Sequence, residues 1–140
     1  MGTKIIIRAF SEQDAAHVRE LFIRVNRLLS PPDLRDAFEA YIERALTEEI
    51  GRIPAYYGER DGGFWVAVKG DKVVGTFGLE RTSNDAMELR RMYVDPLARR
   101  RGIARQMLEF AVRRAAAQGI DGRLKADEDP DGSSGDLRPH

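Results

Sequence analysis

Apolar residues in the first third of the chain follow a strand pattern and then two helical patterns. The β-branched run Thr3–Phe10 predicts a strand. Ser11 follows as an N-cap with Asp14 in the capping-box position, and apolar residues then recur at helical spacing as far as Leu28. A second helix is predicted after two prolines, and Gly51 is expected to end it. Its apolar positions are Leu34, Ala37, Phe38, Tyr41, Ile42, Ala45, Leu46 and Ile50.

Three strand patterns and one long helix follow a turn-rich connection at residues 52–63. Gly70-Asp71 joins the first two strands as a hairpin, and Asp95-Pro96 stops the third. A helix begins near Arg101, with Gly119 as the residue that ends it. The three strands are expected at Phe64–Lys69, Lys72–Glu80 and Met87–Val94. The predicted order is therefore β-α-α-β-β-β-α, within one domain at residues 1–120.

The last segment, residues 121–140, has a different composition. Gly122–Asp127 predicts one more short strand, and the rest is typical of a flexible acidic tail. Three aspartates there, beginning at Asp127, match the first half of a calcium-binding loop. Arg138 stands where such a loop requires a bidentate glutamate, so no metal is expected.

Composition excludes several classes of protein. The 140 residues are 42% hydrophobic and 33% charged, which is typical of a soluble globular domain. There is no cysteine, so disulfides, thiolate metal sites and cysteine nucleophiles are excluded. No apolar run approaches the roughly 18 residues of a membrane span, and the N-terminus lacks the pattern of a secretion signal. A cytoplasmic location without a membrane partner is therefore expected.

The charges are uneven although the formal net charge is zero. Eight arginines and only two acids lie between Arg90 and Arg114. The densest cluster lies between the third strand and the long helix, where Gly102 marks the helix entry. A helix N-terminus with a glycine and flanking arginines suits a diphosphate. A solvated charged surface is the alternative, whereas nucleic-acid binding is disfavoured by the zero net charge and the lack of interleaved aromatic residues.

The sequence Arg99-Arg100-Arg101-Gly102-Ile103-Ala104 resembles motif A of the GNAT acyltransferases, [RQ]-x-x-G-x-[GA]. The preceding hairpin, the strand that ends at Tyr93–Pro96 and the helix that follows the motif are also similar to the GNAT core. The resemblance extends from Lys4 to Gly119. It implies an α/β (α+β) acyl-CoA N-acyltransferase fold, in which helices flank a mixed, mostly antiparallel sheet.

The resemblance also implies that acetyl-CoA is the co-substrate. Its pyrophosphate would bind the motif, to which the following residues are assigned: Arg99, Arg100, Arg101, Gly102, Ile103, Ala104 and Arg105. Its pantetheine arm would pair like an extra strand with the backbone near Met92, Tyr93 and Val94. This pairing requires the strands to splay apart close to this point, for which a β-bulge is the usual device.

Acetylation of an amine requires removal of a proton from the ammonium form. Glu88 is the candidate base, because it lies eleven positions before Arg99, as the base glutamate does in the histone-acetyltransferase branch of the family. If the strand is regular, Glu88 shares a face with Arg90. A structural or substrate-orienting role, through an ion pair with an arginine, is the alternative. The acceptor is an amine of a small molecule, peptide or protein.

The chain departs from the family after Gly119. GNAT domains continue with a parallel strand, a further helix and a closing hairpin, but few large apolar residues and no tyrosine follow here. The last helix and hairpin are therefore expected to be missing, and a homodimer is expected to cover the apolar surface that their loss exposes. A catalytically weak or inert acyl-CoA-binding module is the alternative function.

Overall fold

Six strands form one sheet in the computed structural model, which describes residues 4–99, 102–120, 124–126 and 136–137. Their order in the sheet is their order along the chain, and only the pairing of the fourth with the fifth is parallel. The strands are β1 (Ile5–Ala9), β2 (Gly63–Lys69), β3 (Lys72–Ser83), β4 (Ala86–Val94), β5 (Leu124–Ala126) and β6 (Asp136–Leu137).

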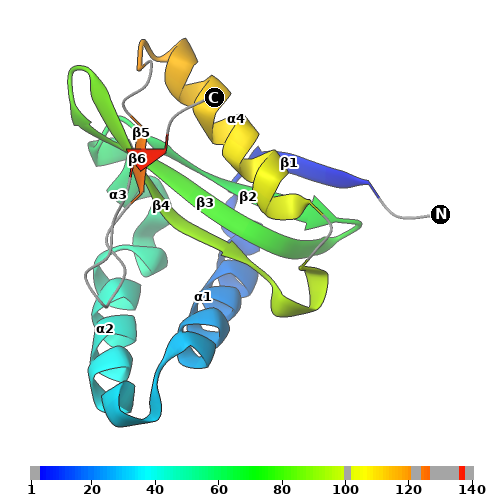
Figure 1. Cartoon of the computed structure of the whole chain (residues 1–140), viewed down its shortest axis with the longest axis vertical. Coiled ribbons are helices and arrows are strands. Elements are labelled where there is room, and N and C mark those ends of the chain that lie inside the picture. The colour runs from blue at the N-terminus through cyan, green and yellow to red at the C-terminus, as the bar shows by residue number, and fades with distance from the viewer. Residues whose placement is uncertain (1–3, 100–101, 121–123, 127–135, 138–140) are drawn as a thin grey trace.

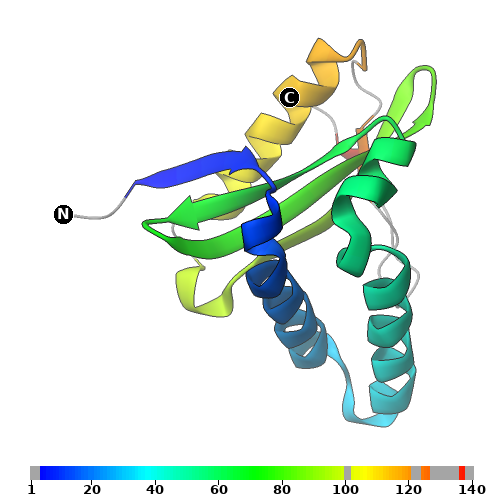
Figure 2. The same cartoon turned by 180° about the vertical axis from the view of Figure 1, so that it is seen from behind.

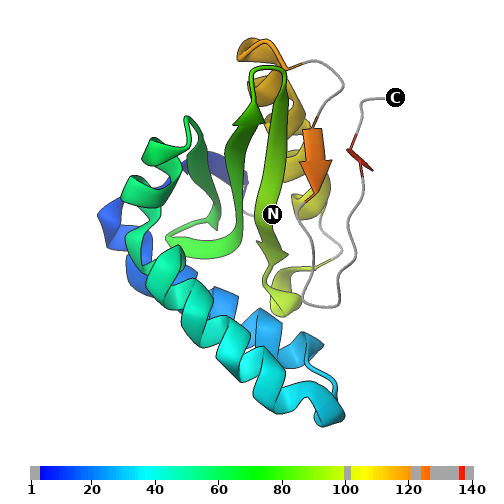
Figure 3. The same cartoon turned by 90° about the vertical axis from the view of Figure 1, so that its left-hand side faces the viewer.

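Helices cover both faces of this sheet (Figures 1 and 3). On one face lie α1 (Ala15–Leu29), α2 (Arg35–Glu48) and α3 (Ile53–Glu59), and on the other lies α4 (Ile103–Ala117). The connected ends of α1 and α2 project well beyond the sheet (Figure 2). Each face has its own apolar core: Phe77, Leu79 and Met107 are fully buried on the α4 side, as are Phe22 and Val66 on the other.

The structure confirms the expected fold class and most of the predicted elements. The Ser11 capping box is present, with the Ser11 N–H donating to the Asp14 carboxylate at 2.9 Å. The hairpin turn lies at Gly70-Asp71, between β2 and β3. Gly119 ends α4 with φ +83, and the N–H groups of Gly119 and Ile120 return to the helix carbonyls of Ala116 and Ala115.

Two predictions in the middle of the chain are wrong. Helix α2 ends at Glu48 rather than at Gly51, which lies in a following 3₁₀ turn. A Cβ at Gly51 would lie 2.6 Å from the Leu46 carbonyl oxygen, so the glycine permits a close approach and does not end the helix. Residues 53–59, expected to be a turn-rich connection, form α3, with Pro54 in the first turn, where proline is tolerated.

The last described residues add two short strands to the sheet. The short strand expected within Gly122–Asp127 is β5, which pairs in parallel with β4. Asp136–Leu137, within the segment expected to be a flexible tail, form β6, whereas residues 127–135 and 138–140 lie outside the described residues. In the described part of the chain, no helix is long and apolar enough to cross a membrane.

Candidate functional site

Strand β4 carries an extra residue near its middle. Arg90 and Tyr93 are three positions apart, but their partners on β3 are only two apart. This mismatch is the β-bulge expected near this point. Within it Arg91 has φ +53, in the left-handed region that favours glycine. The Thr76 hydroxyl donates to the Arg91 carbonyl at 2.9 Å, so the bulge leaves no buried carbonyl unpaired there.

The bulge divides the outer edge of β4 into two parts. Before it, Met87–Leu89 pair with β5. After it, Met92–Val94 have no strand partner on the β5 side among the described residues. The backbone predicted to pair with pantetheine is therefore an open strand edge. Of these residues, Met92 packs on the α4 side and Tyr93 packs on the α1 side, with its ring 5.8 Å from that of Phe22.

A short loop leads from this edge to the start of α4. Asp95, fully buried, accepts hydrogen bonds at 3.0 Å from the Leu97 N–H and from Arg24 of α1. It thereby caps the 3₁₀ turn η4 (Pro96–Ala98) and ties the loop to α1. Gly102 is the N-cap of α4, with φ +71. Apart from its chain neighbours and its own helix, no atom of the described residues lies within 4 Å of the position of a Cβ at Gly102. Glycine is therefore favoured there by its backbone conformation, and the described residues leave the space beside the helix start open.

A surface hollow joins the end of β4 to the start of α4. Its lining residues are Val94, Ala98, Arg99, Gly102, Ile103, Ala104 and Arg105. The structure therefore brings together the described residues of the predicted pyrophosphate site, whereas Arg100 and Arg101 lie outside the described residues. Ile103 is buried against the core. Arg105 has a side chain that is 84% exposed and forms a long ion pair with Glu109 at 3.7 Å. Because such an exposed pair is weak, the guanidinium is available to a ligand.

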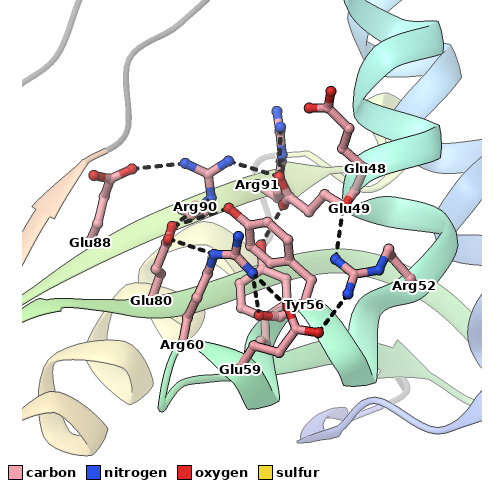
Figure 4. A network of polar contacts seen from close by, with 11 residues as sticks. Glu48, Glu49, Arg52, Tyr56, Glu59, Arg60, Glu80, Glu88, Arg90 and Arg91 are labelled. Carbon is pink, nitrogen blue, oxygen red and sulfur yellow. Dashed lines mark hydrogen bonds and ion pairs between the residues drawn. The ribbon is translucent and has the colours of Figure 1, made fainter.

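Glu88 and Arg90 lie on the face of β4 that also carries α2 and α3, and the Glu88 carboxylate points toward the Arg90 guanidinium (Figure 4). The Arg90 guanidinium donates to Glu88 at 2.9 Å, as their shared face predicts. It also pairs with Glu49, at the end of α2, at 2.8 Å and with Glu80 of β3 at 3.3 Å. Glu80 lies directly opposite Glu88 in the sheet. Arg90 therefore bridges three carboxylates that would otherwise repel one another, and Arg91 and Arg60 supply further positive charge to Glu49 and Glu80.

Glu49 is the centre of this network, although it is only 2% exposed. Arg91 donates to both of its oxygens, at 3.0 and 2.9 Å, and the Tyr57 hydroxyl donates at 2.5 Å. Burial alone would raise the pKa of Glu49, but the hydrogen bonds from Arg91 and the charges of Arg91 and Arg90 outweigh it and lower the pKa to about 2. Burial and the Glu49 charge raise the pKa of Tyr57 well above its usual value.

The low pKa of Glu49 makes the fold sensitive to acid. Because the folded pKa is about 2 and the unfolded one 4.5, the fold above pH 4.5 is about 3 kcal/mol more stable with Glu49 ionised than it would be with Glu49 protonated. That stabilisation is lost as the pH falls from 4.5 toward 2. Urea unfolding at a series of pH values should therefore show a smaller loss of stability over this window in Glu49→Gln than in the wild type. Glu39→Gln, which breaks an exposed pair with Arg27, is the control and should retain most of the wild-type slope.

Sequence reasoning missed Glu49 and Glu80, whereas Tyr57 was considered as a proton donor or substrate contact, with a packing role as the alternative. One signal for Glu49 was present: it continues the buried stripe of α2 at Phe38, Ile42 and Ala45. A charged residue on the apolar side of a helix requires a buried partner. No comparable signal marked Glu80, which comes near the site only through the pairing of β3 with β4.

The family model described as the Acetyltransferase (GNAT) family matches residues 24–134. The chain belongs to the GNAT acetyltransferase family. Two curated relatives are similar to this GNAT chain and are both named N-acetylaspartate synthetase. The Danio rerio protein is 39% identical over 84 residues, covering 56% of this chain and 30% of the relative. The Xenopus tropicalis protein is 42% identical over 78 residues, covering 51% and 29%. The chain thus spans less than one third of either relative.

Solved GNAT structures share the fold. A GNAT family acetyltransferase from Staphylococcus aureus Mu50 aligns with a TM-score of 0.72 and 24% identity, covering 91% of this chain and 75% of that one. The PaiA N-acetyltransferase from Thermoplasma acidophilum, solved in complex with coenzyme A, also has a TM-score of 0.72, with 19% identity and 88% and 78% coverage. The GNAT fold is therefore confirmed over about nine tenths of this chain.

Proposed function

We propose that this GNAT family member transfers the acetyl group of acetyl-CoA to an amine. The observation that carries the proposal is the continuity of the open β4 edge at Met92–Val94 with the start of α4 at Gly102. A strand edge offers backbone groups to the amides of pantetheine. A helix N-terminus offers free N–H groups and positive potential to the pyrophosphate. The coenzyme A bound in the Thermoplasma relative is consistent with this ligand.

The residues around the hollow fit such a ligand. The open space beside Gly102 admits a phosphate close to the backbone, which any side chain would obstruct. The exposed guanidinium of Arg105 and the exposed Arg99 supply positive charge at its rim. In this proposal, Gly102 and the amides after it hold the pyrophosphate, and the arginines increase the affinity.

Glu88 is the proposed base. Its side chain, 28% exposed, lies on β4 before the bulge and on the face of α1–α3. It accepts a proton from the acceptor ammonium, and the free amine then attacks the thioester carbonyl carbon. A C–N bond forms, the C–S bond breaks, and coenzyme A leaves as the thiolate. The acylated nitrogen then loses its extra proton and the thiolate takes up a proton, so that the products are the N-acetylated amine and the coenzyme A thiol.

An amino acid is the proposed class of acceptor, and aspartate is the first member to test. The support is the name of the two relatives, N-acetylaspartate synthetase, and their identity to about half of this chain. The homodimer, the cytoplasmic location and the domain division at residue 120 stay predictions.

The test is release of coenzyme A thiol from acetyl-CoA in the presence of aspartate, other amino acids, small amines and peptides with free N-termini. We expect thiol release that depends on one of these acceptors, together with an increase in Tm on addition of acetyl-CoA. An increase in Tm without thiol release would favour the alternative, an inert acyl-CoA-binding module. Absence of any effect of acetyl-CoA would contradict both functions.

A further inference from the structure

We infer that Glu49, at the end of α2, is a positioning residue that holds the β4 bulge in the conformation required for acetyl-CoA binding. The inference rests on the proposed function, because it assigns a purpose to the open edge beyond the bulge. Glu49 lies 42 positions before Arg91 and is not among the described residues that line the hollow beside the start of α4. In the described part of the chain, its side-chain contacts with β4 are those with Arg90 and Arg91.

The bulge depends on the backbone conformation of Arg91. A non-glycine residue with φ +53 is strained and persists only where its surroundings hold it. The Glu49 carboxylate receives the Arg91 guanidinium as a fork, with contacts at 3.0 and 2.9 Å. Tyr41 accepts a further hydrogen bond from the same guanidinium, and Thr76 holds the carbonyl. The left-handed residue is thus fixed at both its side chain and its backbone.

The bulge also sets the direction of the Arg90 side chain. Because the bulge adds one residue, Arg90 and Arg91 point to the same face of the sheet, and both reach Glu49. Arg90 also holds Glu88 at 2.9 Å. One carboxylate therefore aligns the proposed base on one side of the bulge and the open strand edge on the other.

The energetics of the ion pairs around Glu49 also bear on its role. Buried ion pairs contribute little net stability, because desolvation of the charges offsets their attraction. If stability were the only requirement, apolar side chains at this position between α2 and β4 would stabilise the fold at least as much. A buried carboxylate with two arginines and a tyrosine instead fixes directions, since every contact is a hydrogen bond with defined geometry. Contacts of this kind favour a positioning role for Glu49 over a purely stabilising one.

The experiment compares Glu49→Gln with Asp14→Asn. Asp14 is also a buried carboxylate (3% exposed) held by an arginine, Arg8, but it lies at the start of α1. The Kd for acetyl-CoA is measured at a temperature at which both variants are folded. We expect the Kd of Glu49→Gln to rise about tenfold and that of Asp14→Asn to stay within twofold. A Kd of Glu49→Gln within twofold of the wild type would overturn the inference.

Two further measurements keep the test decisive. If Glu49→Gln does not fold, Thr76→Val loosens the same bulge from β3, and it too should weaken acetyl-CoA binding; an unchanged Kd would overturn the inference. Hydrogen exchange without ligand should be faster at the amides of Met92–Val94 in Glu49→Gln than in Asp14→Asn. If the wild type does not bind acetyl-CoA, the proposed function fails, and the exchange rates alone decide the inference: equal rates in the two variants would overturn it.

Discussion

Replacing Glu88 by Gln lowers kcat/KM for acetyl transfer about 100-fold or more, the usual contribution of a general base. The glutamine amide retains the shape of the side chain but accepts no proton at neutral pH. The acceptor then reacts only through its small unprotonated fraction. The KM for acetyl-CoA should stay close to that of the wild type, because Glu88 lies opposite Lys125 of β5, before the open edge begins. Steady-state thiol release, with each substrate varied in turn, measures both quantities.

The pH dependence sharpens this prediction. As the pH rises toward the pKa of the acceptor amine, the amine loses its proton without help, so the deficit of Glu88→Gln should narrow. Glu80→Gln is the matched control: it removes a carboxylate that is also paired with Arg90 and lies opposite Glu88. We expect a much smaller loss in Glu80→Gln. An equal loss in the two variants, or a deficit of Glu88→Gln that does not change with pH, would show that Glu88 acts only through its ion pair.

Replacing Gly102 by Glu should weaken acetyl-CoA binding about 100-fold or more. A carboxylate beside the helix start would occupy the open space and repel the pyrophosphate, with an energy of about 4 kcal/mol at 4 Å for an effective dielectric constant near 20. The φ of +71 at Gly102 adds a strain of about 1–2 kcal/mol for any other residue. Gly102→Ala carries this strain without the charge and should therefore weaken binding much less. Isothermal titration of the three proteins with acetyl-CoA measures the difference.

Gly119→Glu is the matched control for this change. Gly119 also has a positive φ, +83, and no described side chain or neighbouring segment within 4 Å of its Cβ position, but it lies at the other end of α4, about 25 Å away at 1.5 Å per residue. A carboxylate at the C-terminus of a helix is unfavourable, whereas one at the N-terminus is favourable. The control should therefore lose at least as much stability as Gly102→Glu while its affinity is unchanged. Equal affinities for Gly102→Glu and Gly119→Glu would contradict the pyrophosphate site.

Local sequence signals predicted most of the fold because they act over a few residues. Short apolar runs bounded by turn residues predicted β2, β3 and β4, and helical spacing predicted α1, α2 and α4. Helix α3 was missed because its seven residues begin with Ile53-Pro54 and include Gly58, a composition typical of loops. It is held in place by Tyr57, which contacts the sheet and Glu49. Tertiary contacts of this kind leave no local pattern.

The candidate site was likewise predicted only where its residues are adjacent in sequence. Motif A and its setting predicted the hollow around Gly102, because glycine, strand end and helix start are adjacent in sequence. The network around Glu49 was not predicted, since its members come from α2, α3, β3 and β4 and meet only in the folded chain. The bulge is visible in the spacing of the apolar residues of β4. The buried Met87 and Leu89 have odd numbers, but Met92 and Val94, on the same face, have even ones.

That change from odd to even numbering has a consequence for insertions and deletions. Loss of one of the two bulge arginines, Arg90 or Arg91, would restore a regular alternation, and the four apolar side chains of β4 would still face α4. The core therefore does not need the extra residue. A chain without it would keep the same packing, with β4 free to pair along its whole length. In an alignment of related sequences, a one-residue deletion at this point would identify proteins that retain the fold but lack the open strand edge.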